Sequence, residues 1–174
     1  MLKNLQKRSY LCPPMKKSNC YIYKAEKQDM KDVLELIHGL AIYEKAPDAV
    51  EIDLVQLEQD GFGEEPLFEV FLAKVNGEVA GMALYYNTYS TWKGRMMYLE
   101  DLFVKEAYRR SGVATQLMET LIAVAKAKNA KRIKWQVLDW NQPAIDFYKK
   151  LNANFDSEWV NCDLYEDQIN NFKA

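Results

Sequence analysis

The sequence predicts one layered α/β (α+β) domain, in which helices flank a mixed sheet. Two apolar runs flank Asn76-Gly77, the dipeptide most typical of a tight hairpin, so the strands around it are expected to be antiparallel. A helical pattern over 113–128 lies between two strand-like runs and predicts a β-α-β crossover, which adds a parallel pair. The length of 174 residues, with 49% hydrophobic and 28% charged residues, suits one domain that buries its own core.

The chain is expected to begin with a short strand and two helices. Tyrosine and isoleucine alternate with other residues over 20–25, which predicts the strand. Asp29 suits the N-cap of the first helix, because apolar residues then recur at helical spacing: Met30, Val33, Leu34, Ile37, Leu40 and Ala41. Asp53, with Gln56 three residues later, predicts a capping box for a second helix, and Gly61 is its expected end.

Strands and helices alternate over the rest of the chain. Runs rich in β-branched and aromatic residues predict the strands, and Asn141 with Pro143 predicts the start of the last helix. The expected strands cover 67–74, 78–88, 96–104, 132–140 and 159–165, and the helix between the third and fourth of these covers 113–128.

Charge is distributed unevenly along the chain. The net charge is −2, but residues 1–24 carry six basic residues and no acid, and subtracting those six leaves −8 for residues 25–174. An acidic body argues against a nucleic-acid partner and fits a cationic ligand, although mild acidity also serves solubility alone. Residues 1–19 are expected to form a flexible basic leader, with Met15 as an alternative start, ahead of a domain over 20–174.

No feature of the sequence points to a membrane, a metal or a disulfide. No run of 18 apolar residues occurs, and the N-terminus lacks the apolar core of a secretory signal. The cysteines Cys12, Cys20 and Cys162 are odd in number and form no CxxC pair. The expected location is therefore a reducing compartment, the cytoplasm.

The turn over 108–115 (YRRSGVAT) is the most informative segment, because it lies between a strand and the start of a helix. Free N–H groups at a helix N-terminus attract phosphate, and Gly112 and Ala114 allow a bulky ligand to approach the backbone. Arg109 and Arg110 add charge. The sequence has neither GxxxxGK[ST] nor GxGxxG followed by an acid, which excludes a P-loop and a dinucleotide fold. The turn therefore predicts a diphosphate site, with an ordinary basic helix start as the alternative.

Arg-x-x-Gly-x-Ala after a strand resembles the acetyl-CoA motif of the GNAT superfamily of N-acetyltransferases. Further motifs resemble the spermidine/spermine (diamine) acetyltransferase family, namely Tyr43-Glu44, 60–64 (DGFGE), Trp92-x-Gly94, 98–101 (YLED), Trp140-Asn141 and 147–149 (FYK). The runs 89–95 (YSTWKGR) and 137–142 (VLDWNQ) are most similar to its thialysine acetyltransferase branch. The resemblance covers about Tyr21 to Trp159 and implies a GNAT-like, mostly antiparallel sheet, acetyl-CoA as co-substrate and a homodimer.

The resemblance also implies roles for matching residues. The expected cofactor-binding residues are Leu102, Phe103 and Val104 for the pantetheine arm, Arg109, Arg110, Ser111, Gly112, Val113, Ala114 and Thr115 for the pyrophosphate, and Asn141 near the thioester. The expected acceptor-binding residues are Tyr43, Glu44, Trp92 and Asp101, beside the expected catalytic residues Glu100 and Tyr148.

Three positions depart from the family pattern. Relatives often carry glycine where this chain has Arg110 and Ala114, and both replacements remain compatible with phosphate binding. Ser90 stands where the polyamine-acetylating members carry an acid. Without that anchor for a second ammonium group, the resemblance favours a shorter amine, such as thialysine or a lysine-like amino acid.

The chemistry of acetyl transfer explains why these residue types are needed. An alkyl amine with a pKa of about 10.4 must lose a proton before it attacks a thioester, and Glu100 is the candidate base, acting through a water. Neighbouring strand residues point to opposite faces, so Glu100 and Asp101 can share a ligand only if a bulge intervenes. We therefore expect Glu100 to face the amine, and Asp101 to serve the structure or the dimer if there is no bulge.

The remaining candidates each have a plainer alternative. Tyr148 can protonate the leaving thiolate, although with 11 tyrosines in the chain it could also simply pack. Trp92 can bind the cation through its ring or serve packing alone. His38, the single histidine, lies in a predicted helix, and the cysteines have no evident base partner. Direct attack within a ternary complex is therefore expected rather than a covalent acyl-enzyme.

These observations predict an enzyme that moves acetyl from acetyl-CoA to a primary amine of a small cationic acceptor. The alternatives are a protein or peptide N-acetyltransferase and a non-catalytic CoA-binding module. A closed acceptor pocket favours the first of these functions, and an open groove favours a peptide.

Overall fold

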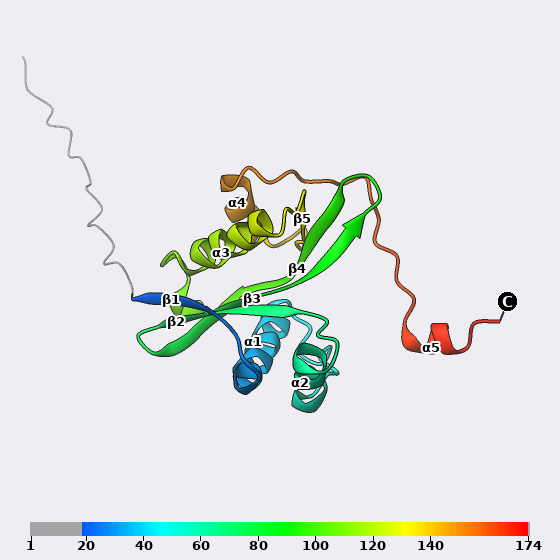
Figure 1. Cartoon of the computed structure of the whole chain (residues 1–174), viewed down its shortest axis with the longest axis horizontal. Coiled ribbons are helices and arrows are strands. Elements are labelled where there is room, and N and C mark those ends of the chain that lie inside the picture. Colours follow the sequence, from blue (N-terminus) through cyan, green and yellow to red (C-terminus); the bar gives the residue numbers. More distant parts are fainter. Residues whose placement is uncertain (1–18, 174) are drawn as a thin grey trace, which may run out of the picture. The chain divides into compact units, whose positions relative to one another are not determined.

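The structure, a computed structural model, describes residues 19–173 (Figure 1). The predicted leader therefore lies outside the described residues except for Asn19. The chain divides into two compact units, one ending at Trp135 and the other beginning at Gln136.

The first unit is built on a five-stranded sheet in the order β1-β2-β3-β4-β5. The first four strands are antiparallel and β5 is parallel to β4, which confirms the mixed, mostly antiparallel sheet. The strands are β1 (Cys20–Lys24), β2 (Glu69–Val75), β3 (Glu78–Ser90), β4 (Gly94–Val104) and β5 (Ile133–Lys134).

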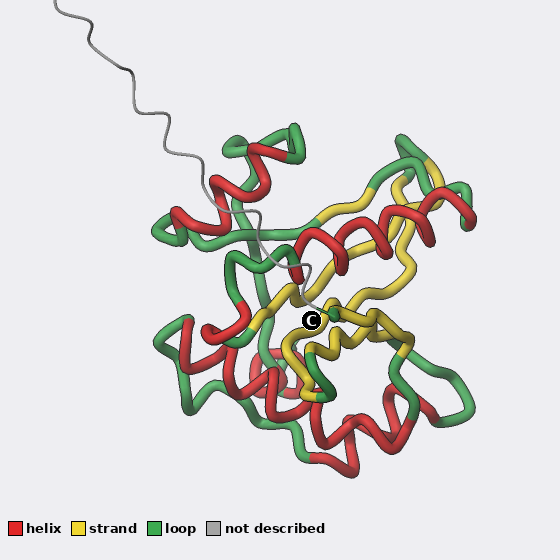
Figure 2. Tube along the Cα trace, turned by 90° about the vertical axis from the view of Figure 1, so that its left-hand side faces the viewer, coloured by secondary structure: helices red, strands yellow, loops and turns green. Residues whose placement is uncertain are grey.

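Helices cover both faces of this sheet. The α-helices of the unit are α1 (Met30–Tyr43), α2 (Leu54–Phe62) and α3 (Val113–Ala127), and single 3-10 turns precede α1 (Lys27–Asp29) and α3 (Glu106–Tyr108). Helices α1 and α2 lie against one face and α3 against the other, and Figure 2 shows the same layers from the side (Figures 1 and 2). The helix over 113–128 is thus the crossover between the antiparallel strands and β5.

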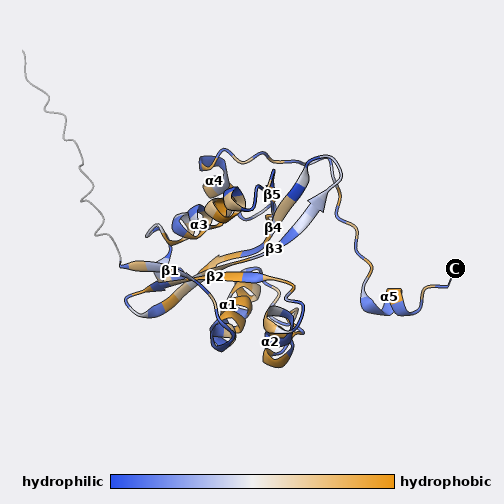
Figure 3. Ribbon diagram, in the orientation of Figure 1, coloured by the Kyte–Doolittle hydropathy of each residue, from blue (hydrophilic) through white to orange (hydrophobic). Residues whose placement is uncertain are grey.

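The core between the sheet and α1 follows from the alternation of side chains along the strands. Met82 and Leu84 of β3 and Phe103 of β4 are buried there against Val33 and Leu36 of α1. Figure 3 shows that the apolar residues of β2 lie in the middle of these layers, with apolar stretches of α1 and α2 beside them. Burial of these side chains, at about 25 cal/mol per Å² of apolar area, stabilises the layers that position the site.

The hairpin predicted at Asn76-Gly77 is confirmed. Asn76 has φ 53° and Gly77 has φ 90°, so both central residues adopt the left-handed conformation that a two-residue hairpin turn requires. Val75 pairs directly with Glu78 across the turn.

The N-cap predicted for α2 is confirmed, but its expected end is wrong. The Asp53 carboxylate accepts a hydrogen bond from the Gln56 N–H at 2.8 Å, whereas the Gln56 side chain donates to Asp60 instead of completing a capping box. The helix continues through Gly61 to Phe62. Gly61 is buried, and a Cβ there would lie 3.0 Å from the Phe68 ring, so glycine at this position allows close packing within the helix.

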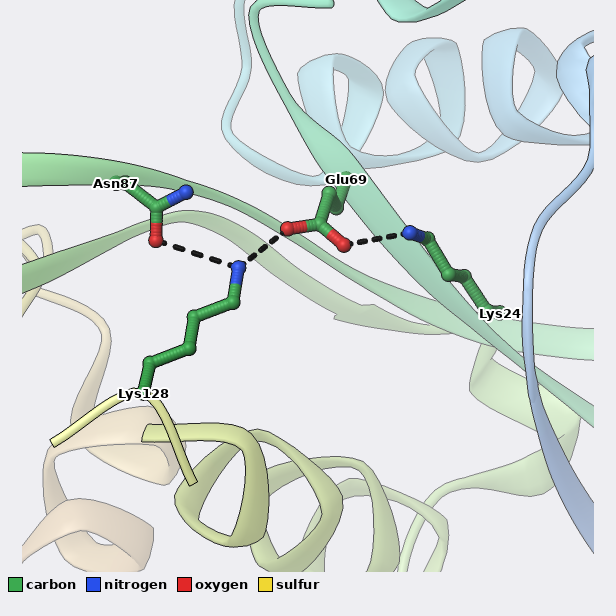
Figure 4. Close-up of polar contacts among 4 residues, drawn as sticks. All are labelled: Lys24, Glu69, Asn87 and Lys128. Atoms are coloured by element: carbon green, nitrogen blue, oxygen red, sulfur yellow. Dashed lines mark hydrogen bonds and ion pairs between the residues drawn. The ribbon is translucent and has the colours of Figure 1, made fainter. Parts of the chain in front are cut away.

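A charged cluster ties the end of α3 to the sheet (Figure 4). The Glu69 carboxylate binds the ammonium groups of Lys128 at 2.5 Å and Lys24 at 2.6 Å, and Lys128 also donates to the Asn87 side chain. Burial alone would raise the pKa of Glu69, but the two ammonium groups hold that pKa below its ordinary value. Lys128, the C-cap residue of α3, therefore anchors the crossover helix to the sheet.

The second unit contains two helices, α4 (Gln142–Lys150) and α5 (Glu166–Asn170). Two strand predictions fail in the last third of the chain. The run over 132–140 forms strand only at Ile133–Lys134, because β4 offers it pairing partners at Met97 and Tyr98 alone. The expected strand over 159–165 is absent from the described chain, since none of the described strands pairs with it.

We predict that Gly61→Ala lowers the free energy of unfolding by about 1–3 kcal/mol, because the added methyl group must displace the Phe68 ring from a packed position. Urea denaturation at fixed pH measures the change. Val55→Ala is the matched control, because Val55 lies in the same helix and is 76% exposed, and it should change stability by less than about 0.5 kcal/mol. A Gly61→Ala protein as stable as the parent would contradict the packing described here.

Candidate active site

A single extra residue interrupts the pairing of β3 with β4. Leu84 pairs with Asp101, whereas the next residue of β3, Tyr85, pairs with Leu99. Glu100 therefore has no residue directly opposite it. This arrangement of two residues against one is a β-bulge, which bends the strand and redirects the side chains that follow.

The bulge brings both carboxylates to one face of the sheet. Directly paired residues share a face, so Asp101 lies on the face of Leu84, which packs beneath α1. Tyr86 follows Leu84 by two residues, so it lies on the same face, and its partner Tyr98 lies there too. Glu100 follows Tyr98 by two residues and therefore shares that face. Glu100 and Asp101 therefore both lie on the α1 side, so the reason for setting Asp101 apart from the ligand no longer holds.

A third carboxylate joins this pair from the end of α1. Glu44 is the C-cap residue of that helix, and burial raises the pKa of its side chain. Burial, followed by the charges of Glu100 and Glu44, raises the pKa of Asp101 to about 6. The three residues thus form an acidic cluster (Glu44, Glu100 and Asp101), a type of site that suits a cation.

The structure adds a residue that the sequence did not single out. The Tyr86 hydroxyl donates a hydrogen bond to Oε2 of Glu100 at 3.1 Å, and the Tyr86 ring stacks on Tyr98 with centroids 5.4 Å apart. Counting back along β3 from the turn at 91–93 would have placed Tyr86 opposite Tyr98, and so diagonally beside Glu100. Counting in this way requires knowing that Ser90 pairs with Gly94, and the residues of the turn do not determine that register.

The predicted diphosphate turn is built from two left-handed residues. Arg110 has φ 59° and Gly112, the N-cap of α3, has φ 88°. These dihedrals turn the chain sharply into the helix, whose first N–H groups, at Val113 to Thr115, have no carbonyl one turn earlier to bond. The Ser111 hydroxyl donates to the Tyr108 carbonyl at 2.5 Å and fixes the turn from within. The turn therefore has the backbone geometry of an anion site.

Arg109 links this turn to the end of α1. Its Nε donates to the Val104 carbonyl at 3.0 Å, and its guanidinium lies over the Tyr43 ring, 4.4 Å from the centroid. A pocket of about 450 Å³ opens here, with Gly39, Tyr43, Phe103 and Arg109 among its lining residues. Tyr43 immediately precedes Glu44, so this contact connects the basic turn with the acidic cluster.

The edge of β4 that follows Tyr98 is open in the described part of the chain. Strand β5 pairs only with Met97 and Tyr98. The backbone of Leu102, Phe103 and Val104 therefore has no strand partner on the side opposite β3, where an extended ligand can add to the sheet. The Val104 carbonyl is already engaged by Arg109.

Trp92 lies at the tip of the β3–β4 hairpin and is 82% exposed. At about 3.3 Å per residue, β4 places Gly94 about 20 Å from Glu100, so the structure does not bring Trp92 to the acidic cluster within this unit. The Ser90 hydroxyl accepts hydrogen bonds from the N–H groups of Trp92 and Lys93 at 3.3 and 3.2 Å. Ser90 therefore serves the turn itself.

Asn141 and Tyr148 belong to the second unit. The Asn141 side chain caps α4 by accepting a hydrogen bond from the Ala144 N–H at 3.3 Å, and Asn141 is buried. Tyr148 is also buried, with its ring 5.4 Å from that of Phe147. The helix is thus capped as predicted, and the catalytic role of Tyr148 stays a prediction.

Among residues 19–173, no three His, Cys, Asp or Glu side chains gather in a way that could hold a metal ion. Within the same residues, no helix has the length and apolar character needed to cross a bilayer.

Comparison with known proteins gives consistent matches over most of the chain. Residues 30–153 match the acetyltransferase (GNAT) family. The chain is 40% identical over 157 residues to the thialysine N-epsilon-acetyltransferase of Bos taurus, covering 84% of this chain and 92% of that protein. It is 35% identical over 139 residues to spermidine/spermine N(1)-acetyltransferase-like protein 1 of Homo sapiens, covering 76% of this chain and 20% of that protein.

Solved structures share the fold. An integron cassette protein of V. cholerae superposes with a TM-score of 0.72 at 26% identity, covering 87% of this chain and 95% of that one. An aminoglycoside acetyltransferase from an uncultured soil sample has a TM-score of 0.71 at 18% identity, covering 84% and 95% of the two chains, which shows the fold alone. The family match includes the bulged strand and the turn before α3, and the chain belongs to the acetyltransferase (GNAT) family.

Proposed function

We propose that this enzyme moves acetyl from acetyl-CoA to a primary amine of a small cationic acceptor, by direct attack within a ternary complex. The observation that supports this most directly is the β-bulge at Glu100, which turns Glu100 and Asp101 toward the same face as Glu44. An acidic cluster of this kind attracts an ammonium group and includes a carboxylate that can accept its proton.

The relatives support a small amine rather than a peptide. Four of them are named thialysine N-epsilon-acetyltransferase, at 34–41% identity, and one from Arabidopsis thaliana is named L-ornithine N5-acetyltransferase, at 36% identity over 109 residues. These acceptors are amino acids that carry one reactive side-chain amine. The family resemblance favours the same class of acceptor, because Ser90 stands where the polyamine-acetylating members carry an acid.

Acetyl-CoA is the proposed co-substrate. The turn from Arg109 to Thr115 fits the diphosphate, because its left-handed residues direct backbone N–H groups outward at a helix start. The open edge at 102–104 fits the amides of the pantetheine arm, as an added strand would. Asn141, at the start of α4, is proposed to contact the cofactor near the thioester.

The chemistry divides between the two ends of the acyl transfer. Glu100 takes the proton of the ammonium group through a water, and the free amine attacks the thioester carbonyl. The departing thiolate has a parent pKa of about 8.5, and Tyr148 is the proposed donor of its proton.

We further propose that the enzyme acts as a homodimer, because the family resemblance implies one. We propose the cytoplasm as its location, because Cys20 and Cys162 are free thiols, which suits a reducing compartment.

An acceptor panel tests the proposed function. Thiol release from acetyl-CoA should be fastest with thialysine, L-ornithine or L-lysine, because relatives of this chain are named for acceptors of this kind. Spermidine and putrescine should give a lower kcat/KM, and N-terminal peptides should give none. Turnover restricted to peptides would instead support the protein N-acetyltransferase alternative, and binding of CoA without any turnover would support a non-catalytic module.

We predict that Asp101→Asn increases stability at high pH. An aspartate whose folded pKa is raised to about 6 disfavours folding when it is ionised, so this penalty is present above pH 6 and disappears as the pH falls toward the unfolded value near 3.9. The variant should gain about 1–2 kcal/mol in unfolding free energy at pH 8 and less at pH 5, as solvent screens part of the effect. Urea denaturation at the two pH values measures this. The matched control is Asp48→Asn at an exposed position, and an equal gain in that control would contradict the assignment.

We predict that Tyr148→Phe lowers kcat about ten-fold or more, because general acid catalysis contributes at least that much, and leaves the affinity for CoA unchanged. Steady-state kinetics and calorimetry with CoA measure the two effects. Tyr165→Phe, at an exposed position in the same unit, is the control and should behave like the parent enzyme. Unchanged turnover in Tyr148→Phe would remove this residue from the mechanism.

A further inference from the structure

We propose that Tyr86 is a positioning residue for the reaction, which holds the Glu100 carboxylate in place from the opposite strand. The inference rests on the proposed function, because it assigns the proton-accepting role to Glu100. It adds a residue that no sequence motif indicated.

The need for such a residue follows from the bulge. Glu100 is the extra residue of β4 and has no residue directly opposite it on β3, so backbone pairing constrains it less than its neighbours. Its side chain has several rotatable bonds, and a base that moves freely is badly placed for proton transfer. A hydrogen bond to the carboxylate can fix the orientation of the Glu100 side chain, which backbone pairing leaves unconstrained.

Tyr86 supplies this contact from a rigid position. Its hydroxyl donates to Oε2 of Glu100 at 3.1 Å. Its ring stacks on Tyr98, the residue directly opposite, with centroids 5.4 Å apart and 21° between the ring planes. The two half-buried rings support each other, so the hydroxyl is aimed by packing as well as by its own bond.

The hydrogen bond from Tyr86 gives the two oxygens of the Glu100 carboxylate different roles. Tyr86 occupies Oε2, and Oε1 remains to accept from a water or from the ammonium group. Burial, followed by the charge of Glu100, raises the pKa of Tyr86 to about 12. The phenol therefore stays protonated over the working range of pH and always acts as a donor, which also excludes it as the base.

The donor also counters the other charges around Glu100. The titratable groups facing it are Tyr86 from β3, Tyr98 and Asp101 from β4, and Glu44 beyond Asp101 at the end of α1. Asp101 and Glu44 add negative charge on this side of the sheet, and the Tyr86 hydroxyl is a donor to the Glu100 carboxylate. A donated hydrogen bond stabilises the charged form of a carboxylate in general. Loss of that bond should therefore shift proton uptake at the base as well as its geometry.

Tyr86→Phe tests this assignment, since it keeps the stacked ring and removes only the hydroxyl. We expect kcat for the best acceptor to fall about ten-fold, with KM for the acceptor changing less than about three-fold, because positioning acts mainly in the transition state. The acid limb of the kcat/KM profile should move to higher pH by about 0.5–1 unit, the amount that one hydrogen bond represents. Tyr89→Phe, on the same strand but 71% exposed, should change neither quantity.

A double-mutant cycle separates positioning from packing. In the Glu100→Gln background, Tyr86→Phe should have little further effect on kcat, because the group that it positions is already lost. Additive losses would overturn the assignment, as would an unchanged pH profile in Tyr86→Phe alone.

A measurement without turnover distinguishes a failure of this inference from a failure of the proposed function. Carbon-detected NMR of side-chain carboxylates, with Glu100 assigned from the signal missing in Glu100→Gln, follows its titration directly. The midpoint should rise in Tyr86→Phe relative to the parent and to Tyr89→Phe. An unmoved midpoint overturns the inference even if the enzyme is active. A shifted midpoint in a protein that acetylates no amine supports the hydrogen bond between Tyr86 and Glu100 but overturns the proposed function, and with it the role of Tyr86 in the reaction.

Discussion

The pairing of β3 with β4 slips by one residue at Glu100, and the character of the site depends on that slip. In a regular strand, Glu100 and Asp101 would lie on opposite faces. The bulge instead turns Phe103 into the core beneath α1 and leaves both carboxylates on that same side. One added residue thus serves the packing of the sheet and the charge of the site together.

The arrangement carries a cost in stability, which is typical of functional sites. Three carboxylates of like charge lie close together, and one of them, Asp101, is partly withdrawn from water with a raised pKa. A protein selected only for stability would not retain such a group. Within the proposed function, a bound ammonium group offsets the repulsion among these carboxylates. The repulsion in the free enzyme therefore favours binding of the acceptor.

A short series of contacts joins the sites proposed for the two substrates within the first unit. Arg109 begins the basic turn, bonds the carbonyl of Val104 and lies over the ring of Tyr43. Tyr43 precedes Glu44, whose charge is felt at Asp101. The basic turn and the acidic cluster are therefore linked through the Tyr43 ring and through β4, the strand along which the pantetheine arm is proposed to bind.

The sequence by itself determined the elements whose causes are local. The Asn76-Gly77 hairpin, the Asp53 cap, the crossover helix and the turn before it depend on neighbouring residues, and the motif in that turn indicated the family. Only the tertiary structure decided the bulge and the position of Tyr86 beside Glu100. It also decided the cation–π contact of Arg109 with Tyr43 and the absence of strand pairing at 159–165 in the described chain. Each of these depends on which residue of a distant segment stands opposite. Strand register is set by packing across the whole sheet, and a single slip moves every later side chain to the other face.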